Sequence, residues 1–184
     1  MKVLQNILFV IQGTPNLANK LRNLALVALM AALANILSAP PFAIPIGPRP
    51  ALHFTQFPIL LVAMLAGPVA GLMTGAIGGL LSSFVVVPEI PFIAGGLAIL
   101  GCAAGFLGKK LRPLYAGILA WVVQAPYLVI TDYAWFTIFA PGMSQGALWV
   151  FIGTVLLLFT FEVLVSLVLA EVVIGYMKKA GIAL

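Results

Sequence analysis

Charged side chains are scarce in this sequence, and their scarcity decides which kinds of protein it can form. The 184 residues include nine Lys or Arg and four Asp or Glu, whereas 64% of the residues are hydrophobic. A soluble globular chain is about half apolar, so this chain has too little polar surface to coat a water-soluble domain. The mean hydropathy of +1.23 supports the same conclusion. We therefore expect one domain whose outer solvent is the lipid bilayer.

Other absences exclude several kinds of functional site. The chain has one cysteine, Cys102, and one histidine, His53, so it offers neither a disulfide framework nor a cluster of metal donors. It also lacks a Gly-x-x-x-x-Gly-Lys phosphate loop, a Gly-x-Ser-x-Gly elbow and a His-Glu-x-x-His motif. We expect no catalytic residues, no metal and no cofactor. The net charge of +5 is better explained by anionic lipid headgroups than by nucleic acid.

The basic residues that are present lie in three clusters between long apolar stretches. The clusters are Lys2, Lys20 and Arg22, then Lys109, Lys110 and Arg112, then Lys178 and Lys179. If all three face the cytoplasm, Arg49 is the one basic residue outside, as the positive-inside rule favours. Successive clusters must then be separated by an even number of spans. We expect a multi-pass protein of the cell membrane with both termini in the cytoplasm.

Apolar stretches bounded by proline and glycine predict an all-α membrane protein with six transmembrane helices. The predicted spans are residues 21–38, 53–66, 69–87, 91–107, 114–136 and 147–176. The second span is short for a crossing that needs about 20 residues, and the break at Gly67-Pro68 either reverses the chain or kinks one longer element. The sixth span is overlong, so we expect it to tilt or to protrude into the cytoplasm.

These spans divide the chain into three parts. Residues 1–20 are expected to form a cytoplasmic or interfacial segment, because the apolar patch at 7–11 is too short to span a bilayer. Residues 21–178 would form the transmembrane domain, and residues 179–184 a short tail.

Small residues recur at helical spacing in three of the spans. The third span has Gly71, Gly75 and Gly79, the fourth has Gly101, Gly105 and Gly108, and the first has Ala25, Ala28, Ala31, Ala32 and Ala34. In lipid, such ridges allow helix backbones to approach closely, so we expect the glycine faces to pack on other helices. The alanine surface either packs within the protein or docks another membrane subunit.

The fifth span holds the richest set of polar and aromatic residues. At about 100° per residue, one third of its circumference carries Trp121, Gln124, Leu128, Thr131, Asp132 and Trp135, with Tyr127 at the edge. An aromatic face with a carboxylate and an amide suits a flat, polar-edged small molecule that enters from outside. Trp135 and the nearby Tyr133 also fit an interfacial aromatic belt, whereas a belt needs neither Gln124 nor Asp132.

Further polar candidates lie outside the fifth span. Glu162, near the middle of the sixth span, is costly in hydrocarbon, so we expect it either at the pocket floor or tying helices together. The outer loops add Arg49, His53, Gln56, Glu89, Gln145 and Trp149. Arg49 is expected either to pair with Asp132 or Glu89, or to meet an anionic group of the ligand. His53 is expected to be a capping or loop residue.

Four stretches, taken together in this order, resemble a known family. They are the alanine-rich helix at 25–32, the Pro/Gly loop into a short helix at 44–58, the turn Gly67-Pro68-Val69-Ala70-Gly71, and the basic turn after the fourth span. Their order resembles the substrate-binding (S) component of energy-coupling factor (ECF) transporters, which take up vitamins and related micronutrients. The resemblance extends over residues 21–178.

The resemblance implies ligand capture from outside, in a pocket formed by the first outer loop and the outer halves of helices four to six. It also implies a membrane coupling subunit and two ATPases as partners, with Ala28 and Ala32 at the contact by analogy. The aromatic and amide content fits a ring compound such as riboflavin or a deazapurine precursor. The predicted ligand-binding residues are Arg49, His53, Glu89, Trp121, Gln124, Tyr127, Asp132, Trp149 and Glu162.

Two other functions can be considered from the sequence. The chain could be a membrane scaffold or assembly protein whose polar residues only tie helices together. A third hypothesis is an intramembrane enzyme, for which Asp132 and Glu162 are the one candidate pair of titratable groups. Their depths differ by about two turns or more, so we do not expect an enzyme.

Overall fold

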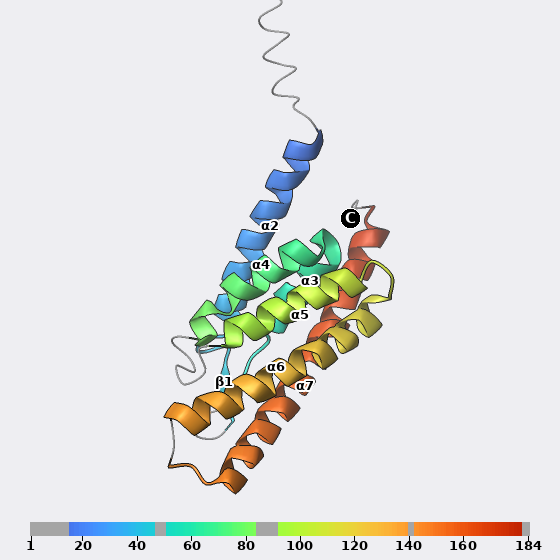
Figure 1. The fold of residues 1–184 in the computed structure, drawn as a ribbon. Coiled ribbons are helices and arrows are strands. Elements are labelled where there is room, and N and C mark those ends of the chain that lie inside the picture. The colour runs from blue at the N-terminus through green and yellow to red at the C-terminus, as the bar shows by residue number, and fades with distance from the viewer. Residues whose placement is uncertain (1–14, 47–50, 84–91, 140–141, 182–184) are drawn as a thin grey trace, which may run out of the picture.

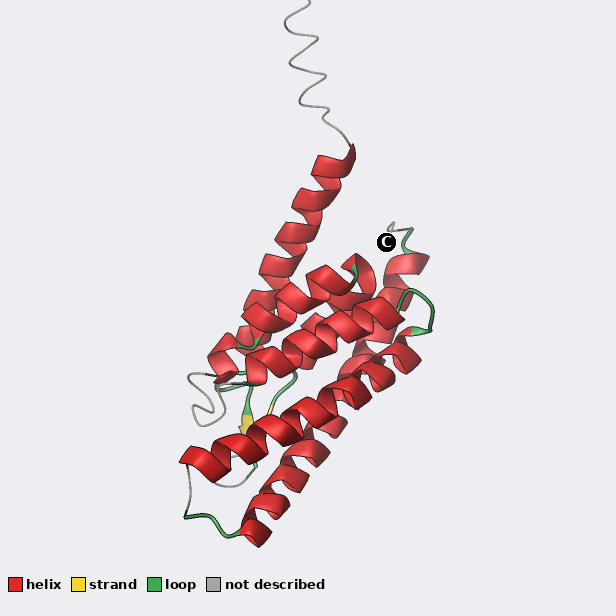
Figure 2. Cartoon of the chain, in the orientation of Figure 1, coloured by secondary structure: helices red, strands yellow, loops and turns green. Residues whose placement is uncertain are grey.

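The computed structural model describes residues 15–46, 51–83, 92–139 and 142–181 (Figure 1). Within them lie the helices α2 (Pro15–Leu37), α3 (Gln56–Ala66), α4 (Pro68–Gly78), α5 (Ile93–Leu107), α6 (Pro113–Phe139) and α7 (Gln145–Lys179). A small antiparallel ribbon joins β1 (Ile44–Pro45) to β2 (Ala51–Leu52), with Ile44 opposite Leu52. The fold is helical, as the sequence predicts (Figure 2).

The helices fall into a long and a short class. Residues 20–37 of α2, together with α6 and α7, are long and apolar enough to cross a bilayer. The helices α3, α4 and α5 have 11, 11 and 15 residues, which corresponds to roughly 16 to 22 Å against a hydrocarbon core of about 30 Å. The short helices pack among the others, so the protein can satisfy backbone groups at their ends. The number of complete crossings stays a prediction.

Several predicted boundaries differ from the structure. The second predicted span begins at residue 53, but α3 begins at Gln56, because residues 53–55 form an irregular connection held by side-chain hydrogen bonds. The helix α2 begins at Pro15, inside the segment predicted to be interfacial, while residues 1–14 lie outside the described residues. The 35 residues of α7 confirm that the sixth helix is overlong.

The chain reverses direction at Gly67, between α3 and α4. Gly67 has φ 87° and ψ −173°, a conformation that is strained for residues with a Cβ. A Cβ built on Gly71 would lie 2.7 Å from the Cβ of Ala63. In one continuous helix these two residues would be about 12 Å apart along the axis. Of the two interpretations of Gly67-Pro68, the structure therefore shows the reversal.

The antiparallel helices α4 and α5 approach so closely that their backbones touch. A Cβ built on Gly71 would lie 2.8 Å from the carbonyl carbon of Gly101, and one on Gly105 would lie 2.6 Å from the Cα of Pro68. Only glycine allows this approach, and it gives the backbones the close dispersion contact on which helix association in lipid depends. The predicted packing is confirmed at glycines 71, 75, 79, 101 and 105. It is wrong for Gly108, which caps α5 and lies outside the interface.

The helix α2 packs on α4 through one face. Ala31 and Ala34 are buried on this face, and a Cβ on Gly78 of α4 would lie 2.7 Å from the Cβ of Ala34. Ala28 and Ala32 are exposed. The predicted alanine surface is therefore divided, with one part packed inside the protein and the other facing outward.

Asn35 of α2 makes two hydrogen bonds at the end of the α2–α4 interface. Its Nδ2 donates to the carbonyl oxygen of Ile77 at 2.9 Å, and its Oδ1 accepts from the backbone N–H of Leu81 at 2.9 Å. Both partners lie where α4 ends, so one side chain satisfies a free carbonyl and a free N–H there.

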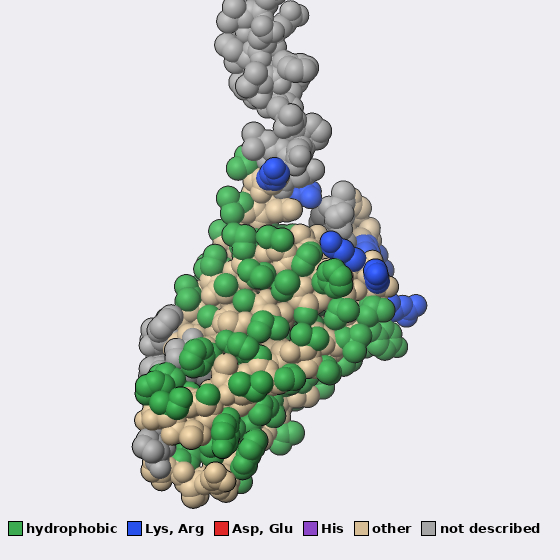
Figure 3. Space-filling view, in the orientation of Figure 1, with side chains coloured by type: hydrophobic (Ala, Val, Ile, Leu, Met, Phe, Trp, Pro, Cys, Tyr) green, Lys and Arg blue, Asp and Glu red, His purple; other side chains and the backbone are tan. Residues whose placement is uncertain are grey.

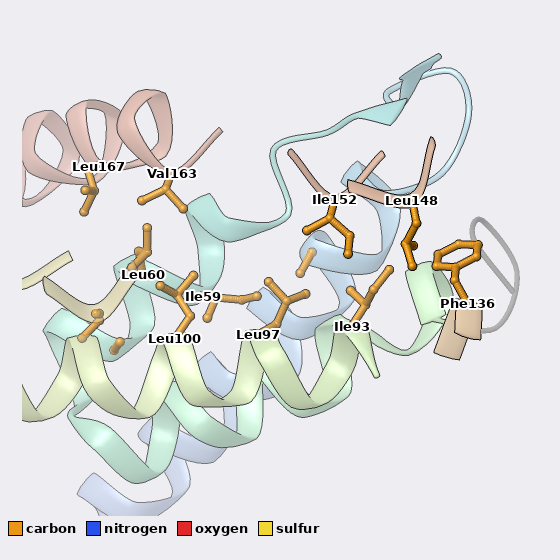
Figure 4. Packing of buried hydrophobic residues seen from close by; sticks show 14 residues of the cluster. Ile59, Leu60, Ile93, Leu97, Leu100, Phe136, Leu148, Ile152, Val163 and Leu167 are labelled. Carbon is orange, nitrogen blue, oxygen red and sulfur yellow. The ribbon is translucent and has the colours of Figure 1, made fainter. Parts of the chain in front are cut away.

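The largest buried hydrophobic cluster joins α3, α5, α6 and α7 (Figure 4). Its labelled members are Ile59, Leu60, Ile93, Leu97, Leu100, Phe136, Leu148, Ile152, Val163 and Leu167. Close packing of these side chains fixes the register of α3 against α7, and this register brings distant polar residues together.

Lys and Arg side chains gather at one end of the molecule, while hydrophobic side chains cover most of the rest of the face that Figure 3 shows. The described basic residues lie at the start of α2, between α5 and α6, and at the end of α7. In Figure 1 the start of α2, the turn between α5 and α6, and the end of α7 all lie toward the same end of the molecule. The prediction that the three clusters share one side is confirmed for these residues.

We expect Gly75→Ala to destabilise the protein, because a Cβ at Gly75 would lie 2.5 Å from the carbonyl carbon of Leu97. Backbone atoms cannot move aside as a flexible side chain can, so the loss should be about 1–3 kcal/mol. Thermal unfolding in detergent would show it as a lower midpoint. Gly153→Ala is the matched control, since nothing lies within 4 Å of a Cβ there. Equal midpoints for the two variants would contradict the interface.

Candidate ligand-binding site

Glu162 of α7 binds the segment that leads into α3. Its Oε1 accepts a hydrogen bond from the backbone N–H of His53 at 2.6 Å, and its Oε2 accepts one from Nε2 of Gln56 at 2.8 Å. Glu162 and Gln56 are both fully buried. Two hydrogen bonds offset part of the cost of burying the carboxyl group. Of the two roles predicted for Glu162, these contacts support helix tethering.

His53 lies directly after β2 and shares the buried environment of Glu162. Its Nδ1 is 3.1 Å from Oγ1 of Thr55 and 3.7 Å from Oε2 of Glu162, and its ring packs edge-on against Phe159. The expected loop position of His53 is confirmed, and its backbone makes the hydrogen bond to Glu162.

Aromatic rings connect this network to α6. Trp121 of α6 stacks on Phe159 of α7, with ring centroids 6.3 Å apart and an interplanar angle of 20°. Leu128 and Val155 pack with Phe159 in the same hydrophobic cluster. The facing surfaces of α6 and α7 therefore form an aromatic and aliphatic wall beside His53.

One face of α6 buries polar atoms that have unused hydrogen-bonding capacity. Gln124, Leu128 and Asp132 follow one another at four-residue spacing, and all three are buried. Among the described residues, neither amide atom of Gln124 nor Oδ1 of Asp132 has a hydrogen-bond partner. Each such buried group costs about 1–3 kcal/mol, and such groups call for a functional explanation.

Gly96 of α5 gives the Gln124 side chain its space. A Cβ on Gly96 would lie 3.2 Å from Nε2 of Gln124 and 3.0 Å from Cδ2 of Leu128. Gly96 and Phe159 were not predicted from the sequence, whereas Gln56 was a polar candidate of the outer loops but not a predicted ligand-binding residue. Phe159 lies three positions before Glu162, and Gln56 lies three positions after His53. This spacing of about one helical turn from a predicted site residue is the sequence signal that could have identified them.

The remaining aromatic candidates join helices at the far end of α6 from the basic residues. The Tyr127 hydroxyl donates to the carbonyl oxygen of Phe92 at 3.3 Å, which ties α6 to the start of α5. Tyr133 stacks on Trp149 at 5.5 Å, and Trp135 packs edge-on against Phe92 at 6.0 Å. Trp149 is 52% exposed, so it lies at the rim of the α6–α7 pair, next in the structure to Tyr133.

Asp132 and Glu162 do not form a catalytic pair. Trp149, which stacks on Tyr133 beside Asp132, precedes Glu162 by 13 residues on α7. These residues correspond to roughly 20 Å along the helix axis. Among the described residues, His53 is the one titratable partner that lies close to Glu162. Asp132 and Glu162 are therefore too far apart to act together as the acid and base of one reaction.

Arg49 and Glu89 lie outside the described residues. The predicted pairing of Arg49 with Asp132 or Glu89, its predicted contact with an anionic ligand group, and the predicted ligand role of Glu89 stay predictions.

A family model described as "ECF-type riboflavin transporter, S component" matches residues 18–173. The chain belongs to this S-component family. A solved structure described as "Structure and mechanism of the S component of a bacterial ECF transporter" has the same fold, with a TM-score of 0.64 and 22% identity over 86% of this chain and 99% of that one. No curated protein matches the chain.

Membership confirms the resemblance that the sequence predicts. S components are membrane-embedded, substrate-binding subunits of transporters and are not enzymes, so the protein is an all-α membrane protein that functions in transport. The expectation that the protein is not an enzyme is confirmed by its family. A scaffold without a ligand is not favoured, because substrate binding is what defines the family.

The contacts of Glu162 can be tested by replacing it with methionine. Glu162→Met keeps the length of the side chain but leaves the His53 N–H and the Gln56 amide without their acceptor. Each unpartnered donor should cost about 1–3 kcal/mol, which thermal unfolding in detergent would measure. Glu162→Gln should lose less stability, because its amide oxygen still accepts a hydrogen bond and the Gln56 amide can turn to pair with it. Glu171→Met, at an exposed position on the same helix, is the control; an equal loss there would contradict the tether.

Proposed function

We propose that this S component captures riboflavin, or a closely related ring compound, from outside the cell. The observation that carries the proposal is the row of buried, unpartnered polar atoms of Gln124 and Asp132 beside the Trp121–Phe159 stack. The family model supports riboflavin over a deazapurine precursor, since it describes riboflavin transporters.

The chemistry of a flavin ring suits these groups. The polar edge of the ring system carries carbonyl oxygens and an N–H group, and its faces are flat and apolar. The Gln124 amide can both donate and accept a hydrogen bond, whereas the Asp132 carboxylate accepts. Aromatic side chains such as Trp121 and Phe159 offer flat surfaces on which a ring can stack. His53 and Glu162 then support the wall at the start of α3, and Tyr127 and Trp149 hold the helices around it.

Uptake requires partner subunits, because this chain has no phosphate-binding loop of its own. In the S-component family, a membrane coupling subunit and two ATPases supply the energy of ATP hydrolysis. The outward-facing Ala28 and Ala32 of α2 give that coupling subunit a smooth, small-residue surface. The basic end of the molecule would face the cytoplasm, where the ATPases act.

Riboflavin titration of the purified protein in detergent tests the ligand. Stacking on Trp121 should quench the flavin fluorescence, and the quenching gives the Kd. Gln124→Leu should weaken binding by about 5- to 150-fold, which corresponds to the loss of one buried hydrogen bond to the ligand. Asp132→Asn should weaken binding by a smaller factor, because its amide oxygen still accepts a hydrogen bond but carries no charge.

Matched controls are available for both changes. Gln145→Leu and Glu171→Gln make similar substitutions at exposed positions and should leave the Kd unchanged. Absence of riboflavin binding by the wild-type protein, or equal effects of control and site variants, would contradict the proposal.

Co-purification with the coupling subunit tests the docking surface. Ala32→Trp places a large ring on the outward face of α2 and should abolish recovery of the coupling subunit and ATPases, while riboflavin binding stays intact. Ala134→Trp, at an exposed alanine of α6, should leave recovery unchanged. Full recovery with Ala32→Trp would place the docking surface elsewhere.

A further inference from the structure

The basic end of the protein contains a cavity that the proposed transport function does not use. Its volume is about 570 Å³, and it lies where α3, α5 and α7 end and α6 begins. Four cationic side chains line it, from Lys109, Lys110, Arg112 and Lys178. Three of them come from the turn between α5 and α6, and the fourth comes from α7, so the fold brings two separate basic clusters to one cavity.

Among the described residues, these four cations have no nearby acidic partner. In the part of the chain that the structure describes, none of them lies within 4.0 Å of a carboxylate, since the contact at that range is the one between His53 and Glu162. Glu171 precedes Lys178 by seven residues on α7, is exposed and does not line the cavity. Like charges around one cavity repel each other, and an anion placed among them would relieve that repulsion.

The cavity is separate from the candidate ligand-binding site. Lys178 follows Glu162 by 16 residues on α7, which corresponds to roughly 24 Å along the helix axis. The remaining wall of the cavity is partly apolar and includes Leu111 and Ile174. Leu111 is exposed beside Arg112, so an apolar surface and a cationic surface meet at this end of the helices.

We propose that this cavity binds the phosphate headgroup of an anionic phospholipid. The cations surround the phosphate, and the acyl chains leave along the apolar wall at Leu111 and Ile174. Arginine contributes most to such a site, because its planar guanidinium can donate two parallel hydrogen bonds to one phosphate. The combination of a basic pocket between helix ends with an apolar exit favours a lipid over free phosphate.

Native mass spectrometry of the detergent-purified protein tests the proposal, with dioleoylphosphatidylglycerol and dioleoylphosphatidylcholine as the lipid probes. The anionic lipid should bind about tenfold more tightly than the zwitterionic one, because only it carries a net charge. Arg112→Gln combined with Lys178→Gln should weaken phosphatidylglycerol binding by about 25-fold, since each cation contributes about a factor of five.

The matched control is Lys20→Gln combined with Arg22→Gln, which also removes one lysine and one arginine from the basic end but lies on α2. It should leave phosphatidylglycerol binding unchanged, and an equal loss in both double variants would overturn the site in favour of diffuse surface attraction. If the first double variant does not fold, Lys178→Gln alone should weaken binding by about fivefold, and an unchanged affinity would overturn the proposal.

A competition experiment separates the two sources of phosphate. Millimolar inorganic phosphate should leave the bound phosphatidylglycerol in place, because it lacks the acyl chains that contact the apolar wall. Complete displacement would overturn the lipid assignment and show that the cavity binds soluble phosphate. None of these outcomes depends on riboflavin, so failure here and failure of the proposed transport function are distinguishable.

Discussion

The hydrogen bonds from His53 and Gln56 to Glu162 determine where the candidate site lies. The helix α3 has 11 residues and is shorter than the hydrocarbon is thick, so the irregular segment before it must find its hydrogen-bond partners within the protein. Glu162 provides them from the middle of α7. This link holds His53 beside Phe159, and Phe159 in turn stacks on Trp121. A single buried carboxyl group thus links the short helix to the two long helices that carry the candidate site.

The two halves of the fold satisfy different physical requirements. Glycines let α4 and α5 pack backbone against backbone, which makes this half tight without polar side chains at the interface. In the other half, α6 buries Gln124 and Asp132, which have polar atoms without a hydrogen-bond partner among the described residues. A closely packed apolar neighbour supplies no hydrogen bonds, which is why these atoms have no partner among the described residues. Gly96 of α5 lies at the contact with α6 and leaves room there for Gln124.

The distribution of charge separates the two ends of the molecule. Cations occupy the ends of α5 and α7 and the starts of α2 and α6, while the unpartnered polar atoms of Gln124 and Asp132 lie further along α6. In a bilayer this arrangement favours one orientation. It also separates the candidate ligand-binding site from the basic end, so a change of charge at that end can leave the candidate site unaltered.

Composition and periodicity were enough to predict the lipid environment, the helical fold, the glycine interface and the polar face of α6. These features depend on how apolar a segment is and on which residues share a helix face, and both are local properties. Tertiary structure decided the rest. Glu162 binds residues that are 109 and 106 positions away. At Gly67 the structure shows the predicted turn and excludes the alternative of one kinked helix. Such features follow from the register of helices packed against one another, and the period of a single helix does not contain that register.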